Sequence, residues 1–229
     1  MKLSPYTQSV LKNFAGINTN QVFNAGDRIN TIAPARNILS SVKLDIEFPE
    51  RFGVYDLNEF LNVVSLVDEP EIKFEDKYAV IGDSTGRTKI KYFFTDIDML
   101  IAPDDNMISK AMDLEDFEVE FTLDADTINR VKRAQSALGH QTLSVTPSSG
   151  AIALTVTDKD NPTSNSFTIE VPGKSKSESF NFLINLNNLR IIQGDYEVGI
   201  SSKMMSRWNH TEQDVVYWIA CEKTSEYGE

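Results

Sequence analysis

Several kinds of residue are scarce in this 229-residue chain, and each shortage excludes a class of protein. Cys221 is alone and cannot form an internal disulfide, which fits a reducing compartment without requiring one. One cysteine and two histidines cannot build a usual structural zinc site. No run of about 18 apolar residues occurs, so no membrane span is expected. The first residues also lack the apolar segment of a signal peptide.

Cations are outnumbered as well. The chain holds 22 Lys and Arg against 34 Asp and Glu, which gives a formal net charge of -12. Such an acidic surface argues against coating nucleic acid as a whole, so any contact with nucleic acid must be local. With 41% hydrophobic and 24% charged residues, the composition is that of an ordinary globular protein. The length allows one large β-rich domain or two smaller ones.

Against this background, three cations fall within the four positions from Arg130 to Arg133. Asp124 is a suitable N-cap and Gly139 a suitable terminator, so a helix is predicted between them. Arg130, Lys132 and Arg133 then spread over the face opposite an apolar stripe. That stripe comprises Thr127, Val131, Ala134 and Leu138, with Ile128 at its margin.

A solvated helix face is the ordinary interpretation of exposed cations. Two features favour a surface for a polyanion instead. The polar helix faces contain Asn, Gln, Ser, Lys and Arg more than carboxylates, and the carboxylates gather elsewhere along the chain. Exposed charges are screened over roughly 8–10 Å in physiological salt, so a local cationic face can attract phosphates despite the distant acidic residues.

The pattern of the first half recurs in the second. A helix is predicted from about Pro5 to Ala15, capped by Ser4 and ended by Gly16. Aligning Leu3 with Leu123 places Lys12 on Lys132. A second helix, predicted after Asp56, corresponds in the repeat to a helix predicted from about Leu186 to Ile192. Each half then reads as helix, strands, helix, strands.

Between the helices, apolar and polar residues alternate as in half-buried strands, for example from Val42 to Phe48 and from Phe117 to Phe121. The fold class is therefore α+β. Two similar helix–sheet domains are predicted, residues 1–108 and 109–229, with a polar connector around Ala102 to Asn106. A single mixed α+β domain with four amphipathic helices is the alternative.

Three fragments resemble enzyme or ion-binding motifs but lack the required context. Gly82-Asp83-Ser84 fits a hairpin turn better than a nucleophile turn, since no triad partner is recognisable. Gly173-Lys174-Ser175 lacks the earlier glycine and the following helix of a phosphate-binding loop. The turn from Asp158 to Pro162 lacks the glycine and glutamate of a calcium loop. No catalytic residue, metal or cofactor is therefore expected, and the chain is predicted not to be an enzyme.

Three segments are more specific. Leu11 to Asn18, Tyr55 to Leu61 followed by Ser65-Leu66-Val67, and Phe180 to Asn185 resemble the sliding clamp of T-even-type tailed phages. The resemblance extends over essentially the whole chain and is weakest at residues 28–48 and 90–101. It implies the DNA clamp fold, in which three subunits close head-to-tail into a ring of six domains with the helices lining the hole.

The resemblance also implies a function. The chain would be the processivity factor that encircles double-stranded DNA without reading its sequence and tethers the phage DNA polymerase. An ATP-driven clamp loader, late transcription factors and further copies of the chain in a homotrimer are the other implied partners, in the cytoplasm of an infected bacterium. The DNA-facing residues would be Lys12, Arg130, Lys132, Arg133 and Arg190, together with Lys2 and Asn13.

Partners of such clamps dock a short hydrophobic peptide into a pocket, for which the connector region supplies candidates. The alternative is that these residues belong to strand and core. Trp208 is expected to be an exposed loop aromatic without an assigned role. The competing function is a β-rich, non-enzymatic interaction or structural scaffold with no DNA role. The candidate pocket residues are Met99, Leu100, Ile101, Met107 and Ile108.

Overall fold

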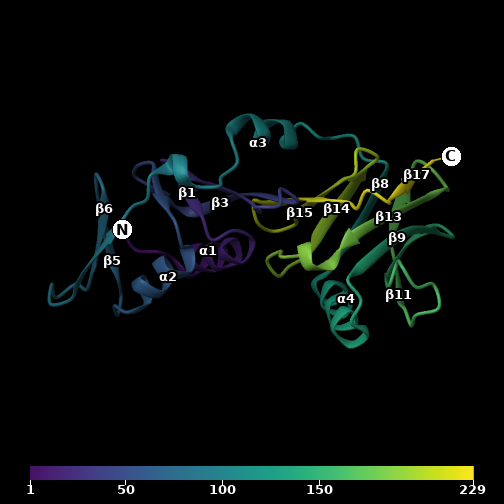
Figure 1. The fold of residues 1–229 in the computed structure, drawn as a ribbon, viewed down its shortest axis with the longest axis horizontal. Coiled ribbons are helices and arrows are strands. Elements are labelled where there is room, and N and C mark those ends of the chain that lie inside the picture. Colours follow the sequence, from purple (N-terminus) through teal and green to yellow (C-terminus); the bar gives the residue numbers. More distant parts are fainter. Residues whose placement is uncertain (229) are drawn as a thin grey trace. The chain divides into compact units, whose positions relative to one another are not determined.

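A computed structural model describes residues 1–228 of the chain (Figure 1). The chain divides into two compact units, the first Met1–Asp105 and the second beginning at Asn106. Each unit combines helices with antiparallel sheet, as predicted. No helix among the described residues is long and apolar enough to cross a membrane.

The first unit contains two α-helices, α1 (Pro5–Ile17) and α2 (Leu57–Ser65), which pack against each other. Antiparallel pairing joins β1 to β4, β2 to β3, and β5 to β6 to β7. A 3-10 turn, η1 (Ile97–Met99), follows the last strand. The strands are β1 (Gln21–Phe23), β2 (Gly26–Ile32), β3 (Ile38–Phe48), β4 (Phe52–Val54), β5 (Glu71–Glu75), β6 (Tyr78–Gly82) and β7 (Lys89–Phe93).

The second unit contains most of α3 (Asp105–Met112), then α4 (Ala125–Leu138) and the 3-10 turn η2 (Leu186–Asn188). Its strands form two antiparallel arrays, ordered β11-β10-β9-β13-β17 and β12-β8-β14-β15-β16. The strands are β8 (Val119–Leu123), β9 (Thr142–Ser148), β10 (Ala151–Thr157), β11 (Phe167–Val171), β12 (Gly173–Ser175), β13 (Phe180–Asn185), β14 (Tyr196–Ser201), β15 (Met205–His210), β16 (Val215–Ala220) and β17 (Glu226–Tyr227).

The predicted internal repeat is visible in the hydrogen bonds. In the first unit the Leu57 amide donates to the carbonyl of Thr19, just after α1, over 2.8 Å. In the second unit the Leu186 amide donates to the carbonyl of Gln141, just after α4, over 2.7 Å. The two halves therefore use the same device to join the end of one helix to the start of the next.

The second helix of the repeat is not repeated in full. The predicted helix from Leu186 to Ile192 is wrong beyond Asn188, because η2 ends there. Leu189 and Ile191 are both buried, a spacing of two that a helix cannot keep on one face. The backbone of Ile192 bonds instead to tyrosine hydroxyls of β14 and β16.

Two glycines predicted to end helices behave differently. Gly139 follows α4 in the left-handed conformation, with φ 71°, as predicted. Gly16 lies inside α1, so its prediction as a terminator is wrong. The helix ends at Ile17, two residues later than predicted, because Asn18 is extended and its side chain donates to the carbonyls of Ile32 and Ile101.

One further expectation is wrong. Trp208 is fully buried on β15, where its indole N–H donates to Ser206 Oγ over 2.9 Å. Alternation along the strand explains this, because Ser206, Trp208 and His210 share the inner face.

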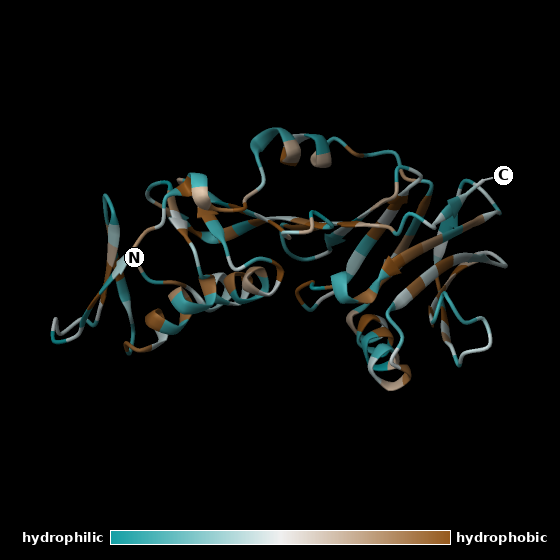
Figure 2. Ribbon diagram, in the orientation of Figure 1, coloured by the Kyte–Doolittle hydropathy of each residue, from teal (hydrophilic) through white to brown (hydrophobic). Residues whose placement is uncertain are grey.

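The connector contains a helix, α3, although no side chain of α3 is buried. Figure 2 shows hydrophilic and hydrophobic residues alternating along the helices, as one-sided packing requires.

The two glycines give a matched test of backbone conformation. A Cβ at either position would meet no atom within 4 Å, so packing does not distinguish them. Gly139→Ala should lower the free energy of unfolding by about 1 kcal/mol, because a left-handed alanine is strained. Gly16→Ala should raise it by about 0.5–1 kcal/mol, because alanine is the better residue inside a helix. Urea unfolding of the two variants checks the opposite signs, and equal shifts would contradict them.

Candidate nucleic-acid interface

The N-terminus of α4 is held by two carboxylates. Asp124 Oδ1 accepts the Thr127 amide over 2.7 Å, and Asp195 Oδ1 accepts the Ala125 amide over 2.8 Å. The hydrogen bonds from Thr127 hold the pKa of Asp124 below its ordinary value. Carboxylates satisfy the free amides at this end of a helix and complement its dipole. The start of α4 is therefore firmly placed.

Burial then decides which face of α4 is presented to solvent. Ile128, Val131 and Ala134 are buried, so Ile128 belongs to the centre of the apolar stripe and not to its margin. Thr127 and Leu138 are half-buried. The predicted stripe is therefore rotated slightly, and the face opposite it still carries the three predicted cations.

The three cations of α4 have few partners. Arg130 is exposed, and its guanidinium lies 6.0 Å from the ring centroid of Phe167 on β11. Arg133 Nη2 lies 4.0 Å from Asp126 Oδ1, and both side chains are 74% exposed, so this pair contributes little. Lys132 is half-buried, and its ammonium makes no ion pair within the described residues. Burial lowers the pKa of Lys132.

A shallow hollow of about 800 Å³ runs along this face of α4. Two cations and two amide or hydroxyl donors line it, beside a single carboxylate. Such a mixture suits the oxygens of a phosphate backbone, which accept both charged and neutral hydrogen bonds. The lining residues are Asp126, Asn129, Lys132, Arg133, Ser136 and Ala137.

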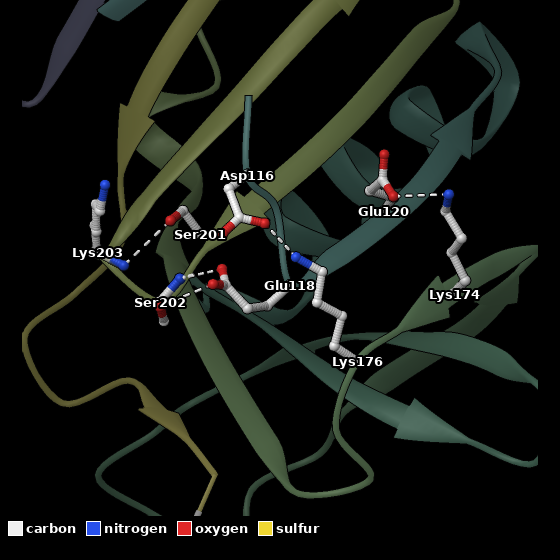
Figure 3. Close-up of polar contacts among 8 residues, drawn as sticks. All are labelled: Asp116, Glu118, Glu120, Lys174, Lys176, Ser201, Ser202 and Lys203. Carbon is white, nitrogen blue, oxygen red and sulfur yellow. Dashed lines mark hydrogen bonds and ion pairs between the residues drawn. The ribbon is translucent and has the colours of Figure 1, made fainter. Parts of the chain in front are cut away.

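The lysines at the edge of the neighbouring sheet behave differently (Figure 3). Lys174 Nζ lies 2.9 Å from Glu120 Oε2, and Lys176 forms an ion pair with Asp116. The bond from Lys176 lowers the pKa of Asp116. Glu118, between these two carboxylates, accepts the amide and hydroxyl of Ser202 at 2.6 and 3.0 Å. Each of these two lysines therefore has a carboxylate partner, in pairs about as exposed as that of Arg133, whereas Lys132 of α4 forms no ion pair in the described residues.

Arg190 lies beside α4 although it comes from a different element. Gln135 of α4 donates to Asn187 Oδ1 over 3.0 Å, which ties η2 to the helix. Arg190 follows η2, is exposed, and donates from Nε to the carbonyl of Asn187 over 3.1 Å. The structure thus links Arg190 to α4 through Asn187.

The remaining predicted DNA-facing residues belong to the first unit. Lys12 is exposed on α1 and Asn13 beside it is half-buried. Lys2 precedes the helix and pairs with Glu69 over 3.4 Å, with both side chains more than half exposed. Lys12 is thus placed like Lys132 in the repeat, but on a face with fewer cations.

The predicted partner-pocket residues divide between the units. Met99 and Ile101 are 76% and 45% exposed, and Leu100 lines a hollow of about 420 Å³ in the first unit. Met107 and Ile108 lie half-buried on α3 in the second unit. None of the five lies in a strand, contrary to the alternative assignment.

Sequence reasoning missed most of the hollow around Leu100. Its other walls include Val22 and Asn30 from β1 and β2, and Arg51 before β4. These residues are far apart along the chain, and no spacing signal connects them. Leu100 itself packs over Gly53, where an added Cβ would lie 2.7 Å from the leucine Cδ1.

The fragments that resemble enzyme motifs have ordinary structural roles. Gly173-Lys174-Ser175 is the strand β12, and Gly82-Asp83-Ser84 begins the turn between β6 and β7. The turn at Asp158 is closed by its own side chain, which accepts the Asp160 amide. No group of three or more potential metal ligands occurs within residues 1–228.

Comparison with known proteins agrees over both halves. Residues 2–108 match the family described as DNA polymerase processivity factor, and residues 120–223 match the family described as gp45 sliding clamp, C terminal. The chain is 34% identical to the sliding clamp of Vibrio phage KVP40, with 97% of this chain and 99% of that protein covered. It is 28% identical to the sliding clamp of Escherichia phage RB69, with 98% of each covered.

Among solved structures, the fold is similar to proliferating cellular nuclear antigen from Entamoeba histolytica. The TM-score is 0.67, and the match covers 94% of both chains at 11% sequence identity, which establishes the likeness of the folds. The duplicated helix–sheet units described above are thus the units of a DNA clamp fold. Together with the near-complete match to the phage relatives, this places the chain in the family of phage sliding clamps, the processivity factors of DNA polymerase.

Proposed function

We propose that this clamp closes as a homotrimeric ring around duplex DNA and tethers the phage DNA polymerase to it, with the α4 face turned toward the DNA. The observation that carries the proposal is the contrast in charge pairing. Lys174 and Lys176 of the sheet edge each form an ion pair with a carboxylate, whereas Lys132 forms no ion pair in the part of the chain described. Unneutralised cations on one helix are the chemistry that a phosphate backbone requires.

The proposed contacts with the DNA backbone are individually weak. Backbone contacts carry no sequence information, and each weakens with salt through the release of counterions. Ring closure, and not affinity, would hold the protein on DNA, so a few cations per subunit suffice and tight binding would prevent sliding. The net charge of -12 would keep DNA away from the remaining surface.

The chain acts in this proposal as a tether and not as an enzyme. A separate ATP-driven loader opens the ring, and late transcription factors use the same mobile tether in the cytoplasm of the infected bacterium. The hollow around Leu100, where Val22 and Ile97 meet the carboxylates of Asp98, Asp104 and Asp105, is the proposed dock for a partner peptide, and the exposed Met99 beside it can adapt to several partners.

Two edge strands support the ring. In the described sheets, β7 ends the array β5-β6-β7, and β11 ends the array β11-β10-β9-β13-β17. An edge strand offers unpaired amides and carbonyls to another chain. Lys89 and Lys91 are exposed on β7, and Glu170 is exposed on β11, so the two edges carry opposite charge. We assign these edges to the head-to-tail contact between subunits.

Replacing Arg130, Lys132 and Arg133 together with Ala tests the DNA-facing surface. The variant should fold and assemble, but should dissociate several-fold faster from nicked circular DNA after loading, because its phosphate contacts are lost. The matched control replaces Lys174, Lys176 and Lys203 with Ala, which removes the same charge from the sheet edge and from the turn between β14 and β15. Equal retention of both variants would overturn the assignment of the α4 face.

Substitutions of Lys132 alone separate its effect on stability from its effect on retention on DNA. Because burial lowers its pKa, the folded state binds the ammonium proton less tightly than the unfolded chain does, and the charged form costs stability at neutral pH. Lys132→Met should therefore raise the urea midpoint while it shortens retention on DNA. The gain should shrink as the pH rises through the folded-state pKa toward the ordinary value of 10.5. Lys132→Arg, which keeps the charge, should show no such gain.

Native mass spectrometry tests the ring. The expected species is a trimer of 25.7 kDa chains at adequate concentration. Phe93 is 63% exposed on β7, and Phe93→Glu should shift the mass toward the monomer because it places a carboxylate in the proposed contact. Leu66→Glu, at a residue 73% exposed after α2, is the control and should stay trimeric. A wild-type chain that is monomeric at every concentration would contradict the proposal.

A further inference from the structure

The segment between η2 and β14 presents Arg190 to solvent. Leu189 and Ile191 are 5% and 7% exposed, so they fix the backbone on both sides of Arg190. Arg190 itself is exposed and is the single cation of this segment in the sequence from 186 to 195. The direction of its side chain therefore depends on how the backbone from 189 to 195, called here the Arg190 loop, is held.

Hydrogen bonds fix both ends of the stretch from Ile192 to Asp195 in the Arg190 loop. Tyr196 Oη donates to the carbonyl of Ile192 over 2.6 Å, and the Ile192 amide donates to Tyr217 Oη over 3.2 Å. At the other end, the Asp195 carbonyl accepts the Thr211 amide over 3.0 Å, while its carboxylate caps α4. Gln193 and Gly194 lie between these anchors.

His210 lies directly against that intervening stretch. The residue is 8% exposed at the end of β15, and its ring stands edge-on to Tyr196 with centroids 5.1 Å apart. A Cβ added to Gly194 would lie 2.0 Å from His210 Nε2. The ring therefore occupies the space that any other residue at position 194 would need, and it forms the floor of the loop.

The partners of the ring define its protonation. Nδ1 faces the amides of Glu212 and Gln213 at 3.1 and 3.2 Å, and a nitrogen that accepts from two N–H groups carries no proton. The single proton of the neutral ring is then on Nε2, which faces the carbonyl of Gln193 at 3.4 Å. His210 thus accepts from one turn with Nδ1 and donates toward the Arg190 loop with Nε2.

We infer that His210 is a positioning residue for Arg190. Its neutral ring, protonated on Nε2, couples the turn from Thr211 to Asp214 to the Arg190 loop and so sets where the Arg190 guanidinium meets DNA. The inference rests on the proposed function for its effect on DNA, but its structural content does not. A histidine that only filled space would need neither the tautomer protonated on Nε2 nor a contact with Gln193.

The tautomer can be measured on the wild-type protein. Long-range nitrogen–proton correlation spectra of the imidazole rings should show His210 Nδ1 without a proton and Nε2 with one at neutral pH. A ring protonated on Nδ1, or on both nitrogens, would overturn the inference directly. This measurement needs no variant and does not depend on DNA.

Two substitutions test the hydrogen bonds of the two ring nitrogens of His210 separately. In His210→Asn, the side-chain oxygen can still accept the turn amides, as Asn does in such turns, but nothing reaches Gln193. Exchange of the Ile192 amide, which is bonded to Tyr217 Oη, should then be about fivefold faster, the factor for one lost hydrogen bond, while the turn amides of Glu212 and Gln213 stay protected. His210→Gln should show the opposite pattern. Thr211→Ala, at an exposed neighbour whose backbone bond is kept, is the matched control and should change neither.

Retention on circular DNA supplies the functional readout. His210→Asn should shorten retention in the wild-type background and should have no further effect when Arg190 is already Ala, because it acts through Arg190. Equal losses in the two backgrounds, or faster exchange with unchanged retention, would refute the positioning role. If the wild-type ring is not retained on DNA at all, the proposed function fails, and the tautomer and exchange results still decide whether His210 holds the loop.

Discussion

The structure depends on the one-sided burial of its helices. Each α-helix of the repeat places one apolar face on other elements of its unit, as Val131 and Ala134 do in α4 and Phe60 and Val64 do in α2. Burying a side chain of this size contributes roughly 1.5–3 kcal/mol. Once that face is committed, the opposite face of the helix has to meet solvent, and its residues are free to serve DNA instead of the core.

Charge pairing then distinguishes among the cations that lie on the exposed surface. The chain is strongly acidic, yet its cations are not treated alike. Lys174 on β12 pairs with Glu120 of β8, whereas neither Arg130 nor Lys132 on α4 forms an ion pair with a carboxylate in the described residues. An acidic protein can therefore keep a short cationic face, because screening isolates it from the acidic remainder. Weak, local attraction is also what a sliding contact needs.

The repeat is conserved in its hydrogen bonds more than in its helices. Asp56 and Asn185 cap corresponding turns, but the first leads into α2 and the second into η2 only. The second unit therefore supplies its extra cation from a loop. A loop residue lacks the intrinsic rigidity of a helix, and the packing of His210 and two tyrosines around the Arg190 loop provides what the helix would have provided.

Local chemistry determined much of this protein: the α+β class, the Asp124 cap of α4, the duplicated order of elements and the cationic cluster from Arg130 to Arg133. These depend on neighbours in the chain, so spacing reveals them. Tertiary structure alone decided the capping of α4 by Asp195, the shortening of the helix at Leu186 and the pairing of Lys174 with Glu120. Those outcomes depend on contacts between segments distant in sequence, where strand register and packing choose the partner, and no local pattern records that choice.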